Sequence, residues 1–288
     1  MLIVISYLFK LYQPLFNFFS VNGNITGFFQ YPNTFALFLL LGIIVIVNNI
    51  SEDKIKSKTT IFNCIKFIIL LFGIIETGSR TIFILLIALF IISIFIKDFR
   101  KTSVLFLILG AVLGTISFVI LLCIGNTEFF SRIASISIFE STFIGRILYM
   151  KDAVIPILTN PLGLGYMGYR YIEGAIQTGV YDVTYVHNDF LQMFLDGGYI
   201  AGISLIVLVV KSLKDKSLDV LPKMIILFIS LSCMLDFHLQ YMSIFFILLI
   251  CFRYNVHKLP TNSKEKSKTT SIKKQSKITV LVQKIKEK

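Results

Sequence analysis

Charged residues and tryptophan are scarce in this sequence of 288 residues: Asp, Glu, Lys and Arg make up 15% of it, and Trp is absent. Soluble domains carry about 25% charged residues, so an ordinary soluble protein is excluded. The four cysteines have no C-x-x-C spacing and no paired histidine, which argues against a zinc site or a disulfide scaffold. The first apolar stretch lacks the small-residue cleavage site of a signal peptide, so we expect no cleavable leader.

Hydrophobic residues are abundant instead, at 56% of the chain, with a mean hydropathy of +0.82. They fall in long unbroken runs, and a helix needs about 20 such residues to cross about 30 Å of hydrocarbon. Convincing runs cover residues 34–50, 61–75, 81–96, 103–124, 190–210, 221–235 and 239–252. Residues 2–19, with Lys10 in the middle, either cross or lie in the interface. The sequence therefore predicts an all-α, polytopic integral membrane bundle of about seven or eight transmembrane helices.

The net charge of +12 is concentrated in a few connections. Lysines gather at residues 54–58, 97–101 and 211–223, and the tail 253–288 holds eleven basic residues against two acidic ones. By the positive-inside rule these segments are cytoplasmic, which makes the long loop 125–189 extracytoplasmic. We predict a transmembrane domain over 1–252 and a basic cytoplasmic tail over 253–288. The charge then reports topology and attraction to anionic membrane lipids, and no nucleic-acid partner is needed to explain it.

The long outer loop is the expected place for function, because connections of this length are functional or disordered. Residues 141–158 predict an amphipathic helix, with an apolar stripe on one side and Arg146, Tyr149 and Ala153 on the other. Pro156 is expected to kink or end this helix. A helix of this kind also suits an interfacial position on the outer leaflet.

Arginine is distributed unevenly. Four of the six arginines fall outside, namely Arg80, Arg132, Arg146 and Arg170, whereas lysine dominates inside. Between residues 125 and 187 the basic residues are outnumbered by acidic ones, four to five, so any anion must be bound by specific placement. A guanidinium offers a rigid fork of donors that matches phosphate or carboxylate. The alternative is that each arginine pairs with a nearby acid.

Two outer residues stand out as candidates for chemistry. Arg80 lies between two apolar runs with almost no loop, where a charge is costly, although Glu76 offers a structural partner. His187 suits proton transfer near neutral pH, although it also directly precedes Asn188, a candidate helix N-cap. A metal site built from His187, His238 and Asp236 is weakly supported, because these residues lie in separate turns, and we expect no metal.

Glycines and tyrosines allow two interpretations each. The G-x-G-x-x-G at 163–168 follows no predicted strand, so we reject a dinucleotide site and expect a tight turn close to a ligand or helix. Gly198 and Gly202 suggest close helix packing. Seven of the twelve tyrosines lie between Tyr149 and Tyr199. They suit either an interfacial belt or flat surfaces for sugar rings.

Several short motifs occur together on the predicted outer side. They are GFFQYPNTFA (27–36), TGSRT (77–81), GR (145–146), NPLGLG (160–165), HNDFLQ (187–192) and GGYIAG (197–202). In this order they resemble the signature of the O-antigen ligase and O-antigen polymerase superfamily. That resemblance implies a glycosyltransferase that takes glycan from undecaprenyl pyrophosphate at the outer face of the cell membrane, without metal or cofactor.

The resemblance also implies roles for individual residues. Arg80 and Arg146 match positions that stabilise the pyrophosphate leaving group. His187 matches the position that activates the acceptor hydroxyl or steadies the leaving group. As substrate-binding candidates we add Arg132, Arg170, Asn188, Tyr149 and Tyr166.

The leading hypothesis is an inverting polymerase of lipid-linked repeat units into surface polysaccharide, such as a capsule. An O-antigen ligase acting on a lipid or other acceptor is the first alternative. A small-solute or lipid transporter is another, for which Lys66 and Asp196 are the main polar residues within spans. Family members usually carry several more spans before the P-N motif. The chain therefore also fits an inactive accessory fragment that works with other polysaccharide-assembly proteins.

Overall fold

The structure is a computed structural model that describes residues 19–52, 58–97, 99–124 and 141–253. The chain divides into two compact units, Met1–Phe252 and Arg253–Lys288, and the first unit contains the helical bundle. The predicted apolar segment at residues 2–18 and the basic tail beyond Arg253 lie outside the described residues.

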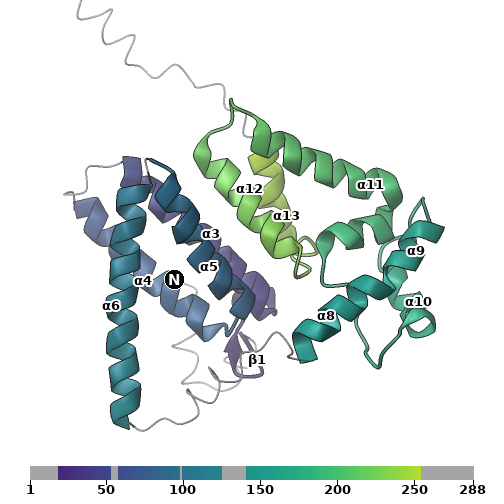
Figure 1. Cartoon of the computed structure of the whole chain (residues 1–288), viewed down its shortest axis with the longest axis horizontal. Coiled ribbons are helices and arrows are strands. Elements are labelled where there is room, and N and C mark those ends of the chain that lie inside the picture. Colours follow the sequence, from purple (N-terminus) through teal and green to yellow (C-terminus); the bar gives the residue numbers. More distant parts are fainter. Residues whose placement is uncertain (1–18, 53–57, 98, 125–140, 254–288) are drawn as a thin grey trace, which may run out of the picture. The chain divides into compact units, whose positions relative to one another are not determined.

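Every predicted apolar run from residue 34 onward forms a helix (Figure 1). These helices are α3 (Pro32–Glu52), α4 (Lys58–Glu76), α5 (Arg80–Phe95), α6 (Arg100–Ile124), α11 (Asp189–Lys214), α12 (Val220–Cys233) and α13 (Met242–Arg253). Within the described residues, three helices contain segments long and apolar enough to cross a membrane: Pro32–Ile50, Thr59–Glu76 and Asp189–Lys214. The mostly helical fold is confirmed, whereas the number of crossings remains a prediction.

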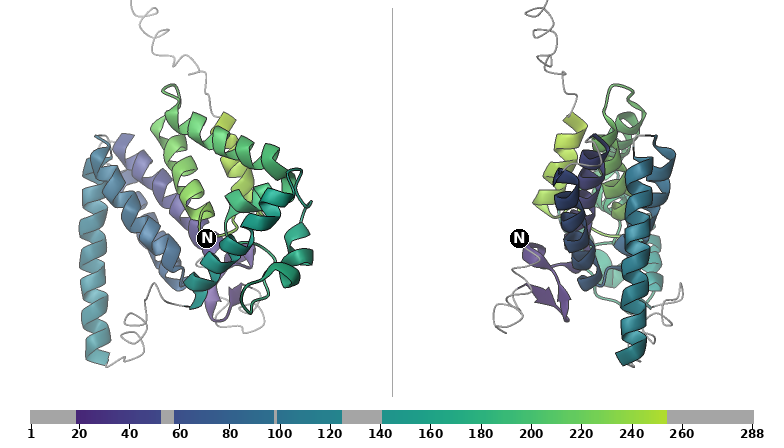
Figure 2. Two further views of the ribbon diagram at one scale, coloured as in Figure 1. Left: turned by 45° about the vertical axis from the view of Figure 1, so that its right-hand side comes forward. Right: turned by 90° about the vertical axis from the view of Figure 1, so that its left-hand side faces the viewer.

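Helix α3 is the best-enclosed of these three helices, because α4, α5, α6 and α12 all pack on it. Its side chains Leu40, Ile43 and Ile50 are fully buried. Aromatic rings fill the space beside it, with Phe67 of α4 stacked on Phe106 of α6 at a centroid distance of 4.0 Å. Helix α6 also packs on α5, along one side of the bundle (Figure 2). The core is therefore a helix-on-helix contact, as ridges-into-grooves packing predicts.

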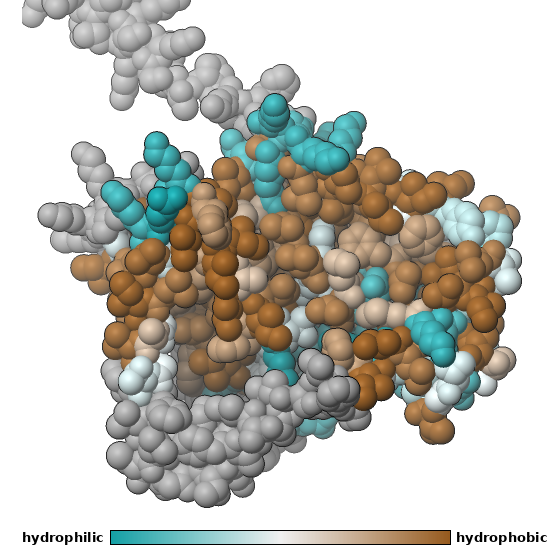
Figure 3. Space-filling view, viewed as in Figure 1, coloured by the Kyte–Doolittle hydropathy of each residue, from teal (hydrophilic) through white to brown (hydrophobic). Residues whose placement is uncertain are grey.

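The outer surface of the bundle is apolar rather than polar. On α5, Phe83, Ile84, Ile87, Ile91 and Phe95 are exposed at helical spacing, and α11 carries a similar exposed set beginning at Ile200. Figure 3 shows hydrophobic side chains over most of the visible helices, with hydrophilic ones gathered where α11 leads into α12. Contiguous apolar surface of this extent is costly in water and suits lipid contact.

The described part of the predicted outer loop, from residue 141 onward, forms three short helices, α8 (Ser141–Asp152), α9 (Val154–Thr159) and α10 (Gly168–Ile176). The single helix predicted over 141–158 is therefore divided at Ala153. Pro156 explains the division, because proline donates no backbone hydrogen bond and its ring crowds the carbonyl four residues earlier, that of Asp152. The predicted apolar stripe faces outward, as the exposed Ile147 and Ile155 show, while Ala153 is buried.

Helix α11 is broken at Gly198, which has φ 69° and ψ −165°. The loop 161–165 fits into the break: Leu164 N–H donates to the Leu195 carbonyl at 2.6 Å, and Gly165 N–H donates to the Asp196 carbonyl at 3.0 Å. The expected tight turn close to a helix is thus confirmed. The expectation of helix–helix packing was wrong for Gly198, because a Cβ there would meet the Pro161 carbonyl oxygen at 2.3 Å.

A small hairpin precedes α3 and departs from the all-α prediction. Strand β1 (Ser20–Val21) pairs antiparallel with β2 (Asn24–Ile25), and the 3-10 helix η2 (Gly27–Phe29) follows. Asn22 and Gly23 both have positive φ, at 50° and 80°. An Asn-Gly pair favours this two-residue hairpin turn, so the sequence carried a signal for it.

Candidate functional site

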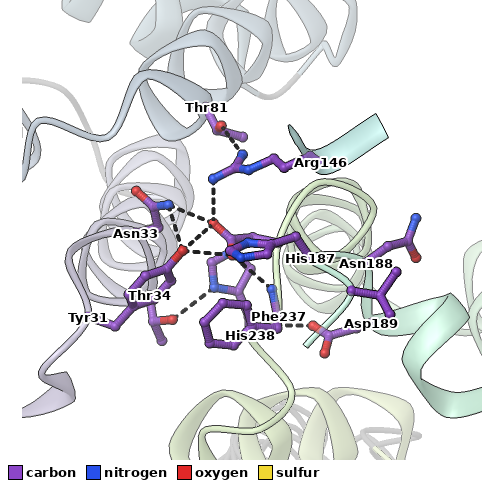
Figure 4. A network of polar contacts seen from close by, with 12 residues as sticks. Tyr31, Asn33, Thr34, Thr81, Arg146, His187, Asn188, Asp189, Phe237 and His238 are labelled. Carbon is purple, nitrogen blue, oxygen red and sulfur yellow. Dashed lines mark hydrogen bonds and ion pairs between the residues drawn. The ribbon is translucent and has the colours of Figure 1, made fainter. Parts of the chain in front are cut away.

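A buried carboxylate, that of Asp236, is the centre of the main polar cluster. It lies between α12 and α13 and accepts hydrogen bonds from the Tyr31 hydroxyl at 2.9 Å and from Asn33 Nδ2 at 2.6 Å. It also forms ion pairs with Arg146 at 3.3 Å and with His187 Nδ1 at 3.1 Å. We call these five residues the carboxylate cluster. Figure 4 shows the four partner side chains converging from different elements.

The local sequence sets where each partner stands. Pro32 begins α3, where its missing N–H costs nothing, so Tyr31 stays just ahead of the helix. The Asn188 side chain caps α11 by accepting from Leu191 N–H at 3.1 Å, which confirms Asn188 as the N-cap. His187 is thereby left outside the helix. Tyr31 and His187 lie just before the starts of α3 and α11, and Asp236 lies just after the end of α12. The cluster is therefore at the opposite end of α11 from the lysines in its last turn.

His187 has an unusual backbone, with φ 53° in the left-handed region. A non-glycine residue there costs of order 1 kcal/mol and persists only where its surroundings hold it. The neighbouring Val186 N–H donates to Gln192 Oε1 at 3.1 Å, and the His187 ring meets the Phe237 ring edge-on at 4.8 Å. These contacts hold the strained backbone of His187 in the conformation that directs its imidazole toward Asp236.

Electrostatics fix the protonation of the cluster. Burial alone would raise the pKa of Asp236, but the hydrogen bond from His187 and the charge of Arg146 act against it, and that pKa lies well below its usual range. Burial and the Asp236 carboxylate raise the pKa of Tyr31 far above its ordinary value, so its hydroxyl keeps its proton. A charged carboxylate only accepts, so the Nδ1 atom of His187 must carry the proton. In the neutral ring, Nε2 is then a proton acceptor.

His238 is separate from this chemistry. Its ring is fully buried, with Nδ1 3.0 Å from the Thr34 hydroxyl and Nε2 2.6 Å from the Ser232 hydroxyl. Burial lowers the pKa of His238 to about 4 against the attraction of Asp236, so the ring is neutral. Among the described residues no group of three or more His, Cys, Asp or Glu side chains is placed to hold a metal ion.

Arg146 links the cluster to the start of α5. Its guanidinium donates to the Asp236 carboxylate and, at 3.4 Å, to the Thr81 hydroxyl. The side chain is 18% exposed, so part of the guanidinium faces outward. Arg80 is exposed and immediately precedes Thr81, at the first position of α5. Fixing one edge of the Arg146 fork on Asp236 and Thr81 presents the remaining donors in a defined direction.

The substrate-binding candidates are dispersed. Tyr149 lies beside the cluster, its ring 5.8 Å from that of His187. Asn188 serves the fold, donating from Nδ2 to the Met234 carbonyl at 3.0 Å. Arg170, on α10, donates to the Thr184 hydroxyl at 2.7 Å rather than to the cluster. Tyr166 is exposed, and Arg132 lies outside the described residues.

Sequence reasoning considered Asp236 only for a weakly supported metal site, and it assigned no chemical role to Tyr31 or Thr81. One signal for Asp236 was present: it is the single charged residue between Lys223 and Arg253, in a short turn between two apolar runs. An acid in such a place usually has a partner or a purpose. Its partners are 49 to 205 positions away, and no local pattern points to them.

The apolar helices and the carboxylate cluster at one of their ends define a helical membrane protein with an arginine–histidine–carboxylate site. Residues 65–206 match the family model of the O-antigen ligases, and this match supports the resemblance to the O-antigen ligase and polymerase superfamily. The match covers Arg80, Arg146 and His187, whereas Tyr31 and Asp236 lie beyond it. No curated protein and no solved structure matches the chain.

Proposed function

We propose that the chain is a metal-independent glycosyltransferase that polymerises undecaprenyl-pyrophosphate-linked repeat units into surface polysaccharide at the extracytoplasmic face. The observation that supports it best is the His187–Asp236 pair, with Arg146 against the same carboxylate. A pair of this kind supplies an oriented base, and the arginine supplies a cation for a phosphate leaving group. The family match supports glycan transfer without deciding between polymerase and ligase.

The base in this proposal is His187 Nε2. The acceptor hydroxyl oxygen attacks the anomeric carbon of the donor sugar as its proton passes to Nε2. The new glycosidic C–O bond forms while the bond from that carbon to the pyrophosphate oxygen breaks. Asp236 holds the imidazole in the required tautomer and stabilises the imidazolium that results, so it acts as a positioning residue.

The leaving group is undecaprenyl pyrophosphate, which departs with the bonding electrons. Arg146, with donors left over beyond Asp236 and Thr81, is placed to bind the developing charge. Arg80, next to Thr81, is the second cation we assign to the pyrophosphate. A guanidinium fork gives this stabilisation without a metal ion.

The test is a reconstituted assay with the full chain in proteoliposomes, defined lipid-linked repeat units and EDTA. We expect long-chain polymer, and we expect His187→Ala to slow its formation about 10²–10⁴-fold, the usual contribution of a general base. Arg146→Ala and Arg80→Ala should also abolish long chains. Arg100→Ala, at the start of α6, is the matched control and should keep full activity.

The outcome distinguishes the alternatives. Unchanged chain length in all three variants contradicts the proposal, and loss of polymer with EDTA contradicts metal independence. Transfer of a single glycan to a lipid acceptor without elongation indicates a ligase. Activity that appears only after a fuller polymerase is added indicates an accessory fragment.

A further inference from the structure

A series of aromatic rings leads from the carboxylate cluster to the surface. Phe237 follows Asp236 in the chain and meets the His187 ring at 4.8 Å. Its face stacks on Tyr31 at 4.8 Å on one side and on Tyr185 at 5.0 Å on the other. The Tyr185 hydroxyl lies 3.4 Å from the Tyr166 hydroxyl at an exposed position. The series thus joins the candidate base to an exposed tyrosine.

Exposure rises along this series. Tyr31, Phe237 and Tyr185 are half-buried, whereas Tyr166 is 70% exposed. Among the described residues, Phe237 is the single ring stacked on Tyr185. Phe237 itself is enclosed by rings on both faces, so Tyr185 and Tyr166 are the two rings of the series available to a ligand.

The chemistry of the two tyrosines suits a sugar. Flat aromatic faces with polar tips pack on the apolar face of a pyranose while their hydroxyl groups bond to its hydroxyls. Burial and the Tyr166 hydroxyl raise the pKa of Tyr185, so this hydroxyl stays protonated and able to donate. A polyprenyl chain, by contrast, has no polar group to which these hydroxyls could bond.

The surrounding charge argues for a neutral ligand. The carboxylate of Asp196 acts on Tyr185, and Asp236 acts on the neighbouring Tyr241. The arginine suited to a pyrophosphate, Arg146, instead contacts Asp236 and Thr81. The two substrates therefore have separate sides: phosphate toward Arg146, and uncharged glycan toward Tyr185 and Tyr166.

We propose that Tyr185 and Tyr166 form a subsite for the acceptor glycan, holding one of its sugar rings so that its nucleophilic hydroxyl reaches His187. This proposal rests on the proposed function for its mechanistic meaning. The binding itself is a separate property, and it is measured without turnover.

The absence of tryptophan from the chain makes a direct test possible. Tyr166→Trp places a single fluorescent ring in the subsite, and Tyr171→Trp, at a residue 87% exposed on α10, is the matched control. Each full-length variant is reconstituted in lipid nanodiscs. It is then titrated with oligosaccharides released by mild acid from the surface polysaccharide of the producing cell.

We expect saturable quenching or a blue shift for Tyr166→Trp and none for Tyr171→Trp. Adding Tyr185→Ala should raise the apparent Kd about three- to tenfold, the usual worth of one aromatic contact. Tyr185→Phe, which keeps the ring, should retain most of the binding and serves as the folding control. Equal responses at both tryptophans, no saturable response, or no effect of Tyr185→Ala would each overturn the subsite.

A kinetic arm separates this proposal from the proposed function. With free oligosaccharide as acceptor, Tyr185→Ala should raise the acceptor KM with little change in the donor KM. A rise in the donor KM alone would assign these rings to the donor glycan and overturn the acceptor subsite. Saturable binding without any polymer from the unmodified protein would sustain the subsite and refute the polymerase.

Discussion

At the scale of single residues, Asp236 organises the site. It is buried, it stays charged, and it receives four donor side chains from three separate parts of the chain. A buried charge is retained only where partners compensate for its desolvation. Each of the five residues of the carboxylate cluster therefore supports the protonation state of the others.

Asp236→Asn tests the positioning role directly. The amide keeps the shape but lets the imidazole adopt the wrong tautomer, so we expect polymer formation to fall about 10²–10⁴-fold. The donor and acceptor KM values should change little if Asp236 acts through His187. A variant with full turnover, or one that changes KM alone, would contradict this role. Thermal unfolding in detergent checks that the variant is folded.

His238 makes a prediction about stability and pH. Its folded pKa of about 4 lies below the ordinary value of 6.5, so the unfolded chain takes up a proton that the folded ring refuses. Stability is full above about pH 6.5 and falls as the pH is lowered toward 4, by about 3 kcal/mol for a shift of this size. The charged neighbours are Asp236, Arg146 and His187.

The measurement compares unfolding of the wild type and His238→Gln in detergent between pH 7 and pH 4. The difference between the two free energies of unfolding should shrink by about that amount as the pH falls, since Gln has no proton to gain. A constant difference over this range would contradict the prediction, because it would show that the ring binds as many protons in the folded state as in the unfolded state.

At the scale of elements, the break in α11 sets the position of the site. The carbonyls of Leu195 and Asp196 would bind residues 199 and 200 in a regular helix, but they accept from the loop 161–165 instead. Tyr199 N–H in turn donates to the Pro161 carbonyl at 2.9 Å. The loop thereby fixes the direction of the first part of α11, which begins two residues after His187.

Gly198→Ala should disrupt this joint. The backbone at φ 69°, ψ −165° is close to glycine-only, and the added Cβ has no room beside Pro161, so we expect a loss of about 1–3 kcal/mol in stability together with lower activity. Gly174→Ala in α10 is the matched control, because a Cβ there meets nothing within 4 Å. Equal melting temperatures for the two variants would refute the role of the break.

At the scale of the whole molecule, sidedness is the property that function requires. The carboxylate cluster occupies one end of the apolar helices, and the lysines after α11 occupy the other end. By the positive-inside rule we predict that the lysines are cytoplasmic and the cluster extracytoplasmic, which is the side that the proposed function requires.

Cysteine labelling measures this arrangement. In a background without the four native cysteines, Val180→Cys between α10 and α11 and Lys216→Cys between α11 and α12 each supply one exposed thiol. A membrane-impermeant maleimide should label Val180→Cys in intact cells and Lys216→Cys only after permeabilisation. The reverse pattern would place the cluster in the cytoplasm and contradict the proposed function.

The sequence by itself determined the mostly helical fold, the membrane class and the family, and it singled out Arg146 and His187, which the structure places against the same carboxylate. Hydropathy and helix caps are local signals. Residues 34–50 show the hydropathy of a span within a single segment, and Asn188 shows a helix cap within a single turn. The tertiary structure alone decided that Asp236 is the partner of Arg146 and His187, and that Tyr185 lies next to Phe237. Packing brings together residues 49 to 205 positions apart, and no pattern along the chain encodes such a contact.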